Sequence, residues 1–219
     1  MPALDVDAVA EWDESRLTFL PTGQHCKPFR CDHSLIPGEC FQFGGRSWEI
    51  HACPGHDDHA VMLFDPTDRI LISGDALWEN GFGVVFPQIE GDDGFQRVND
   101  SLNHIEKLAP HIVIPGHGRV FSQVEIALER AHSRLNQFLQ APKAHDEYAA
   151  KVLIKFKLLE WQSVRREQFL LWADQNVYLQ TLFTKSKVEH GYAAWLDHIL
   201  LQLEATGACS LNDDGISNR

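Results

Sequence analysis

Residues 51–64 read HACPGHDDHAVMLF and residues 111–121 read HIVIPGHGRVF, so the tripeptide Pro-Gly-His occurs twice in the chain. In both stretches a run of residues typical of a β-strand leads into the turn formers proline and glycine, and a histidine follows. Between them, residues 70–77 read ILISGDAL, another apolar run that ends in glycine and an acid. Three predicted strands thus each deliver one histidine or aspartate directly after a glycine.

The three delivered residues, His56, Asp75 and His117, are suited to a metal site. Loops at one end of a sheet bring distant side chains together, and glycine lets the backbone turn sharply there. Two imidazoles and a carboxylate suit zinc or iron, and the two oxygens of Asp75 allow it to bridge two ions. Each residue alone is better explained as a surface or capping residue. Three of them in the same setting favour a metal site.

Composition limits the classes of function. The chain has 219 residues, 44% of them hydrophobic, which suits one large domain or a domain with an appendage. The formal charge of −12 argues against nucleic-acid binding. No apolar run is long enough to span a membrane, and the acidic N-terminus does not read as a signal peptide. The odd number of cysteines, five, predicts reduced thiols. We therefore expect a cytoplasmic protein that acts on a small-molecule substrate.

Short apolar runs predict strands in the first part of the chain. Residues 41–53 read FQFGGRSWEIHAC, which predicts two strands joined at Gly44-Gly45, because paired glycines tolerate the positive φ angles of a tight hairpin. A glycine-rich loop, NGFGVVFP at residues 80–87, is predicted after Asp75. Further strands are predicted at residues 60–65, 69–73 and 111–114.

Apolar residues at helical spacing predict helices in the remainder of the chain. From residue 144 onward no strand is predicted, and the last residues, LNDDGISNR, are expected to fray. The chain is therefore expected to divide into an α/β domain, residues 1–141, and a helical extension, residues 142–219. The predicted helical faces are Val98-Leu102-Ile105-Leu108, Val124-Leu128-Ala131-Leu135-Phe138, Tyr148-Val152-Phe156-Leu159 and Val188-Tyr192-Trp195-Ile199-Leu203.

The motifs PGHDDH, SGDAL and PGHG, in this order, resemble the C-terminal half of the metallo-β-lactamase superfamily of hydrolases. The resemblance covers roughly residues 40–140, including the hairpin GGRSWEIHACPGH. It implies an α/β (α+β) fold: the C-terminal half of an αββα sandwich, followed by a helical extension. It also implies that His56 binds one metal, that Asp75 bridges two metals, and that His117 binds the second.

The resemblance further implies metal-assisted hydrolysis, in which a metal-bound hydroxide attacks an acyl centre. A thioester or ester is the expected substrate, as in glyoxalase II-like members. Zinc is the expected cofactor, as one or two ions, with iron or manganese as alternatives. His51 and His59 flank the first motif and are candidates for orienting a ligand. Trp78 and Phe82 follow Asp75, and a pocket-lining role is expected for them.

The sequence departs from the family at its strongest signature. No His-x-His-x-Asp-His occurs anywhere in the chain, so we expect the C-terminal portion of such a hydrolase, with weak metal binding and poor activity. Half of the sandwich would also leave one sheet face uncovered. Such a face recruits a partner, so we expect a homo-oligomer. The expected residues of this face are Val61, Leu63, Ile70 and Ile72.

Two alternatives remain at the sequence level. The chain is either a hydrolase or a non-catalytic dimerising or regulatory module that retains part of the fold. A structural zinc site is also conceivable in the loose cluster formed by His25, Cys26, Cys31 and His33. Its spacing matches no common zinc finger, so ordinary loop residues are the better interpretation.

Overall fold

The computed structural model describes residues 1–17, 19–24, 26–91, 93–212 and 215–219. The chain forms two compact units. No helix in the described ranges is both long and apolar enough to cross a membrane. The first unit contains Met1–Asp13 and Pro28–Gln140, and the second contains Glu14–Lys27 and Ala141–Arg219.

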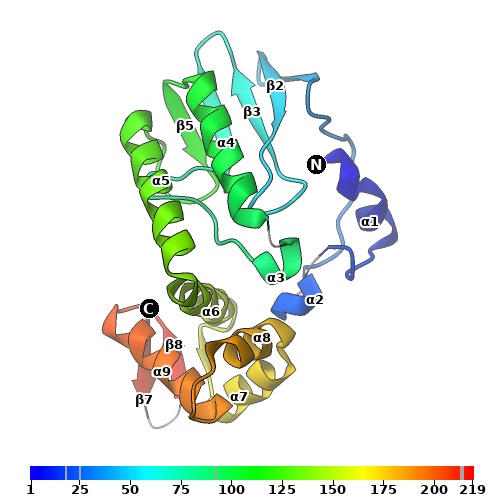
Figure 1. The fold of residues 1–219 in the computed structure, drawn as a ribbon. Coiled ribbons are helices and arrows are strands. Elements are labelled where there is room, and N and C mark those ends of the chain that lie inside the picture. Colours follow the sequence, from blue (N-terminus) through cyan, green and yellow to red (C-terminus); the bar gives the residue numbers. More distant parts are fainter. Residues whose placement is uncertain (18, 25, 92, 213–214) are drawn as a thin grey trace. The chain divides into compact units, whose positions relative to one another are not determined.

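The first unit is built on a five-stranded sheet with the strand order β1-β2-β3-β4-β5. Neighbouring strands from β1 to β4 are antiparallel, whereas β5 pairs parallel to β4. Figure 1 shows helices α4 and α5 lying along one face of this sheet. The strands are β1 (Cys40–Phe43), β2 (Arg46–Ala52), β3 (Val61–Asp65), β4 (Ile70–Gly74) and β5 (Ile112–Pro115).

The β1–β2 hairpin turns at the predicted pair of glycines. Gly44 and Gly45 both have positive φ angles, +60° and +74°, which residues with a Cβ seldom adopt. Positive φ at both central positions matches a two-residue turn, and Phe43 pairs with Arg46 across it. The predicted hairpin is confirmed.

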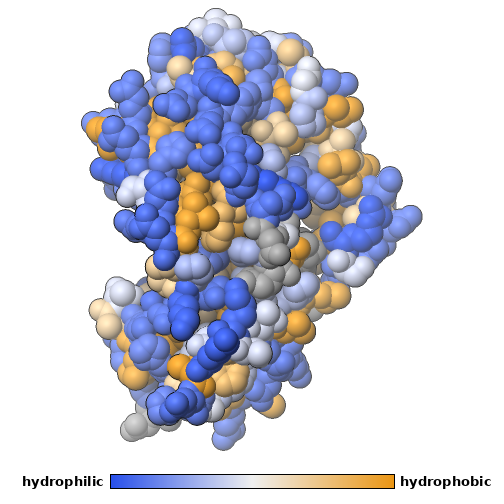
Figure 2. Space-filling model, in the orientation of Figure 1, coloured by the Kyte–Doolittle hydropathy of each residue, from blue (hydrophilic) through white to orange (hydrophobic). Residues whose placement is uncertain are grey.

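Helices α4 (Gly94–Leu108) and α5 (Val124–Gln140) bury their apolar sides against the sheet. Helix α4 is the crossover that makes β4 and β5 parallel. In Figure 2 the surface over these helices is largely hydrophilic, with apolar patches, as expected when most apolar side chains face inward. The shared core includes Met62, Phe64, Leu71 and Val113 from the sheet, Val98, Leu102 and Ile105 from α4, and Val124, Ala127, Leu128, Ala131 and Leu135 from α5.

The opposite face of the sheet is less well covered. Strand register places Leu63 beside Ile72, and Ile72 beside Ile114. The side chains of Ile112 and Ile114 at the β5 end are 37% and 36% exposed. The four residues predicted for an uncovered face, namely Val61, Leu63, Ile70 and Ile72, all lie on this side and are half-buried.

Short helical segments complete the first unit. They are η1 (Ala3–Asp5), α1 (Val6–Glu11) and α3 (Pro87–Glu90). The 3-10 helix η1 precedes α1, and α3 lies just before α4 in the chain.

The second unit is mostly helical but also contains a small sheet with the strand order β6-β8-β7. The prediction of no strands beyond residue 144 is therefore wrong, and so is the prediction of a frayed C-terminus. The elements are α2 (Phe19–Thr22), α6 (Pro142–Trp161), β6 (Ser163–Val164), α7 (Arg166–Gln175), α8 (Val177–Ser186), α9 (Tyr192–Ala205), β7 (Cys209–Asn212) and β8 (Gly215–Asn218).

Tertiary contacts hold these short strands in place. The ammonium group of Lys155 on α6 donates to the carbonyl oxygen of Ala208 at 2.8 Å and to the side chain of Asn218. At the hairpin turn, the side-chain oxygen of Asn212 accepts from the backbone N–H of Gly215 at 2.8 Å. The C-terminal residues are thus anchored by a distant helix, which a local sequence pattern does not reveal.

Two predicted helical faces of the second unit had different outcomes. In α9, Trp195, Ile199 and Leu203 are buried as predicted and Tyr192 is half-buried, whereas Val188 precedes the helix and is exposed. In α6, Phe156 and Leu159 are 41% and 45% exposed, so the predicted face is wrong. The residues that α6 buries instead include Ala149, Ala150, Leu153, Ile154 and Leu158. Because α6 carries apolar residues on several sides, its pattern does not single out one face.

Candidate metal centre

The three predicted ligands leave the sheet at the same edge. Strands β2 and β4 both run antiparallel to β3, and β5 runs parallel to β4. The carboxyl ends of β2, β4 and β5 therefore point the same way. His56, Asp75 and His117 follow these ends, so the topology brings three sequence-distant residues into one place.

The two histidines lie at opposite oxygens of one carboxylate. Nε2 of His56 is 3.3 Å from Oδ2 of Asp75, and Nε2 of His117 is 3.8 Å from Oδ1. The side chains of His56 and Asp75 are 30% and 28% exposed, and that of His117 is 57% exposed. All three are accessible to an ion or a small molecule from solvent.

The loop after Asp75 orients these side chains. The backbone carbonyl of Val84 contacts Nδ1 of His56, and a carbonyl oxygen only accepts hydrogen bonds. In the neutral imidazole, Nδ1 therefore carries the proton, and Nε2, which faces Asp75, has the lone pair. The indole N–H of Trp78 donates to Oδ1 of Asp75 at 3.0 Å. The Trp78 ring also meets the ring of His117 edge-on, with the centroids 5.2 Å apart.

Two glycines permit this close packing. A Cβ atom at Gly83 would lie 2.8 Å from both Cβ of Asp75 and Cγ of His56. A Cβ atom at Gly116 would lie 2.6 Å from Oδ1 of Asp75. The sequence predicts a pocket-lining role for this loop through Trp78 and Phe82, but it does not predict the close approach of Gly83 and Gly116. The Gly-x-Gly of residues 81–83, so soon after Asp75, is the signal that pointed to a close backbone approach.

The other predicted site residues have different surroundings. His51 contacts Glu49, with 3.3 Å between Nε2 and Oε2, and His104, with 3.0 Å between the two ring nitrogens. Nδ1 of His59 lies 2.5 Å from Oδ1 of Asp5. Phe82 is 2% exposed and lies in the hydrophobic core. Of the four residues expected around His56, Asp75 and His117, Trp78 contacts both Asp75 and His117.

The cysteines offer little to this site. Burial raises the pKa of the Cys53 thiol to about 12, with smaller contributions from Asp57 and Asp75, so it stays a neutral thiol at pH 7. Cys26 and Cys31 are free thiols whose sulfur atoms donate to nearby backbone carbonyls. His25, which was grouped with these cysteines in the loose cluster, lies outside the described residues.

The donor set fits half of a two-metal site. Its nitrogen and oxygen donors suit zinc or iron, and the His56–Asp75 and Asp75–His117 pairs provide two places for an ion. Within the described ranges, however, no three His, Cys, Asp or Glu side chains are grouped so that they could hold one ion. Among the residues that the structure describes, each pair therefore offers two protein donors.

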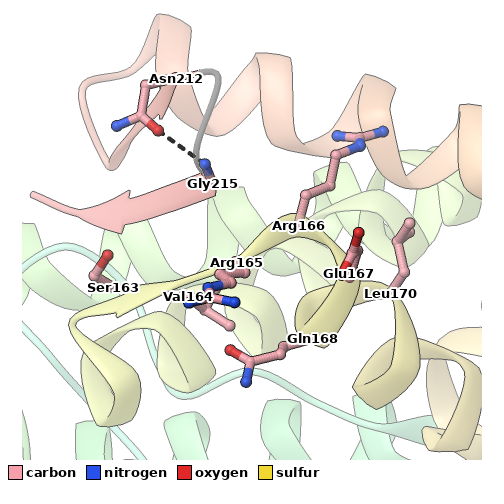
Figure 3. A pocket seen from close by; sticks show the side chains of 9 residues that line it. All are labelled: Ser163, Val164, Arg165, Arg166, Glu167, Gln168, Leu170, Asn212 and Gly215. Carbon is pink, nitrogen blue, oxygen red and sulfur yellow. Dashed lines mark hydrogen bonds between the residues drawn. The ribbon is translucent and has the colours of Figure 1, made fainter.

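The second unit contains a separate groove of about 1200 Å³ at the start of α7. Figure 3 shows Arg165 and Gln168 beside it and the Asn212–Gly215 hydrogen bond at its edge. Arg166 is paired with Asp197 of α9. With Glu167 also in the wall, the groove has no uniform charge, and the function is better sought at the three ligands.

The chain belongs to the metallo-beta-lactamase superfamily, because the family model matches residues 5–117, just over half of the chain. The match spans His56, Asp75 and His117. The resemblance inferred from the sequence motifs is confirmed at the level of the family.

Curated relatives include several hydroxyacylglutathione hydrolases. The chain is 27% identical over 193 residues to the Bartonella henselae protein, covering 86% of this chain and 73% of that one. It is 36% identical over 124 residues to the Halorhodospira halophila protein, covering 54% of this chain and 45% of that one. The chain thus spans about three quarters of one relative and less than half of the other.

Several solved structures have a backbone similar to that of this chain. One is the metallo-beta-lactamase family protein TTHA1429 from Thermus thermophilus, with a TM-score of 0.45, 19% identity, and coverage of 96% of this chain and 65% of that one. Another is TTHA1623 in a di-iron-bound form, with a TM-score of 0.42, 23% identity, and coverage of 56% and 59%.

Proposed function

We propose that this chain is a metal-dependent hydrolase that cleaves a thioester or ester. The observation that carries the proposal is the placement of one imidazole at each oxygen of Asp75, at 3.3 Å and 3.8 Å. The similarity to hydroxyacylglutathione hydrolases supports a thioester as the substrate class. The five free thiols suit a reducing compartment, so we assign the chemistry to the cytoplasm.

In this proposal each side chain has a binding or orienting role. His56 would present Nε2 to one zinc or iron ion, His117 would present Nε2 to a second, and Asp75 would contribute an oxygen to each. A bound ion would polarise the acyl carbonyl and lower the pKa of a water molecule. Trp78 would keep the carboxylate of Asp75 from rotating. None of these side chains is required to transfer a proton.

We further propose that the activity of the 219-residue chain alone is weak. A catalytic zinc ion typically has three protein ligands, whereas each place here has two. The sequence has no His-x-His-x-Asp-His motif that would supply the others. We expect loose binding of metal, or binding of one ion in place of two.

The test combines metal analysis with thioester hydrolysis. The purified full chain is loaded with zinc, iron or manganese, its metal content is measured, and hydrolysis of a hydroxyacylglutathione thioester is followed. We expect Asp75→Asn to abolish both bound metal and activity, whereas His190→Ala, at an exposed histidine of the second unit, changes neither. Activity that survives Asp75→Asn would contradict the proposed metal-dependent hydrolysis at this site. Two tightly held ions per chain would contradict the proposed weakness.

The alternative, a non-catalytic dimerising module, is favoured by one observation. Ile112 and Ile114 are more than one third exposed on a sheet face that also carries half-buried Leu63, Ile70 and Ile72. If the loaded chain forms a dimer through this face but hydrolyses no thioester or ester, this alternative is the better description.

A further inference from the structure

One loop touches all three proposed ligands. Its turn runs from Trp78 to Gly81 and is closed by a 2.7 Å hydrogen bond from the Trp78 N–H to the Gly81 carbonyl. Trp78 then contacts Asp75 and His117, and Val84 contacts His56. A further hydrogen bond of 2.8 Å joins the N–H of Gly83 to the carbonyl of Asp75. The loop is therefore placed to orient all three side chains.

Two arginines of α5 hold the tip of this loop. Nη1 of Arg130 donates to the carbonyl of Glu79 at 3.3 Å and to the side-chain oxygen of Asn80 at 3.0 Å. Nη1 of Arg134 donates to the carbonyl of Asn80 at 3.2 Å. Because these arginines are four residues apart, they lie on the same face of the helix.

Arg134 packs against Gly81 of the loop and against the Phe138 ring of its own helix. Gly81 has a φ of +129°, which favours glycine, and a Cβ atom there would lie 2.8 Å from Nη1 and 3.1 Å from Cδ of Arg134. The guanidinium carbon of Arg134 also lies 5.5 Å from the centre of the Phe138 ring. Hydrogen bonds from a charged donor are stronger than those between neutral groups. The two arginines thus fix the tip against a core-packed helix.

We propose that Arg130 and Arg134 are positioning residues for the metal ligands. They act through the 78–84 loop, which orients Asp75 by the Trp78 indole, His117 by the Trp78 ring, and His56 by the Val84 carbonyl. The inference rests on the proposed function for its consequence in metal binding. The mechanical part, that the arginines hold the loop, stands independently of any metal.

The test uses the full-length double variant Arg130→Gln/Arg134→Gln. Without metal, we expect faster hydrogen exchange at the Trp78 and Gly83 amides and a changed NMR signal of the Trp78 indole, because the tip is released. In a zinc competition titration, we expect affinity to fall about 10- to 100-fold, the range typical of lost supporting contacts around a metal ligand. Replacing both arginines by lysine should restore part of the affinity, because an ammonium group also donates to carbonyls.

The matched control is Arg166→Gln, which removes an arginine from its ion pair with Asp197 in the second unit. It should leave loop exchange and zinc affinity unchanged. The positioning role is overturned if the double variant matches this control in both measurements, or if its melting temperature collapses and the lysine variant rescues nothing. If the wild-type chain binds no zinc, the proposed function fails, and the exchange rates alone decide the positioning role.

Discussion

A methyl group at position 116 tests how tightly the carboxylate of Asp75 is held. A Cβ atom there would lie 2.6 Å from Oδ1 of Asp75 and 3.0 Å from the backbone carbon of Gly74. Because Gly74 is part of β4, the carboxylate must yield, and an ordinary contact of 3.4 Å requires it to move by about 0.8 Å. Overpacking of this kind costs about 1–3 kcal/mol of stability. We expect Gly116→Ala to lose that amount and to bind zinc roughly 10- to 100-fold more weakly.

The assay pairs urea unfolding with a zinc competition titration on the same samples. The control is Gly191→Ala, because Gly191 has a φ of −63° and nothing lies within 4 Å of a Cβ built there. It precedes α9, so alanine costs about 1 kcal/mol or less through a poorer helix start and leaves zinc binding unchanged. Wild-type affinity and stability in Gly116→Ala would refute the reasoning, since the carboxylate would then not be confined by the turn.

Two further predictions concern pH and self-association. The pKa of His104 is lowered mainly by burial and, to a smaller extent, by the charges of His51 and Lys107. On its other side, His51 contacts the carboxylate of Glu49. The unfolded chain therefore takes up the proton first, so the free energy of unfolding should fall as the pH drops below about 6.5 and through the lowered pKa. Urea unfolding at pH 7 and pH 5 should show this loss, and His104→Gln should reduce it; equal pH slopes would contradict the prediction. On the open sheet face, light scattering should detect a concentration-dependent oligomer that Ile114→Lys disperses. A wild-type chain that stays monomeric at high concentration would argue against that interface.

The sequence predicted the sheet and the proximity of His56, Asp75 and His117 for a physical reason. Each ligand follows an apolar strand through a glycine-containing turn. The three residues can meet only if these strands run in the same direction. Strands β2, β4 and β5 do so. Short apolar runs bounded by turn residues also identified β1 to β5, and apolar residues at helical spacing identified α4 and α5.

The missed features depend on contacts between distant residues. Strand β6 has two residues, and β7 (CSLN) and β8 (GISN) consist mostly of small or polar residues, so no apolar run marks them as strands. Their stability comes from Lys155 and from pairing with one another. Likewise, Arg130 lies 51 positions from the loop carbonyl that it contacts. A local pattern marks such an arginine as a solvated helix residue, and only the fold shows what it holds.

The two Pro-Gly-His turns contribute unequally to the proposed site. Asp75 belongs to both donor pairs, whereas each histidine belongs to one. The His56 pair is the closer, at 3.3 Å against 3.8 Å, and His56 has its tautomer fixed by a backbone carbonyl. His117 is the more exposed and is supported by an aromatic ring contact. If a single ion binds, the His56–Asp75 pair is therefore the place for it, and the His117 pair fills only when further donors are supplied.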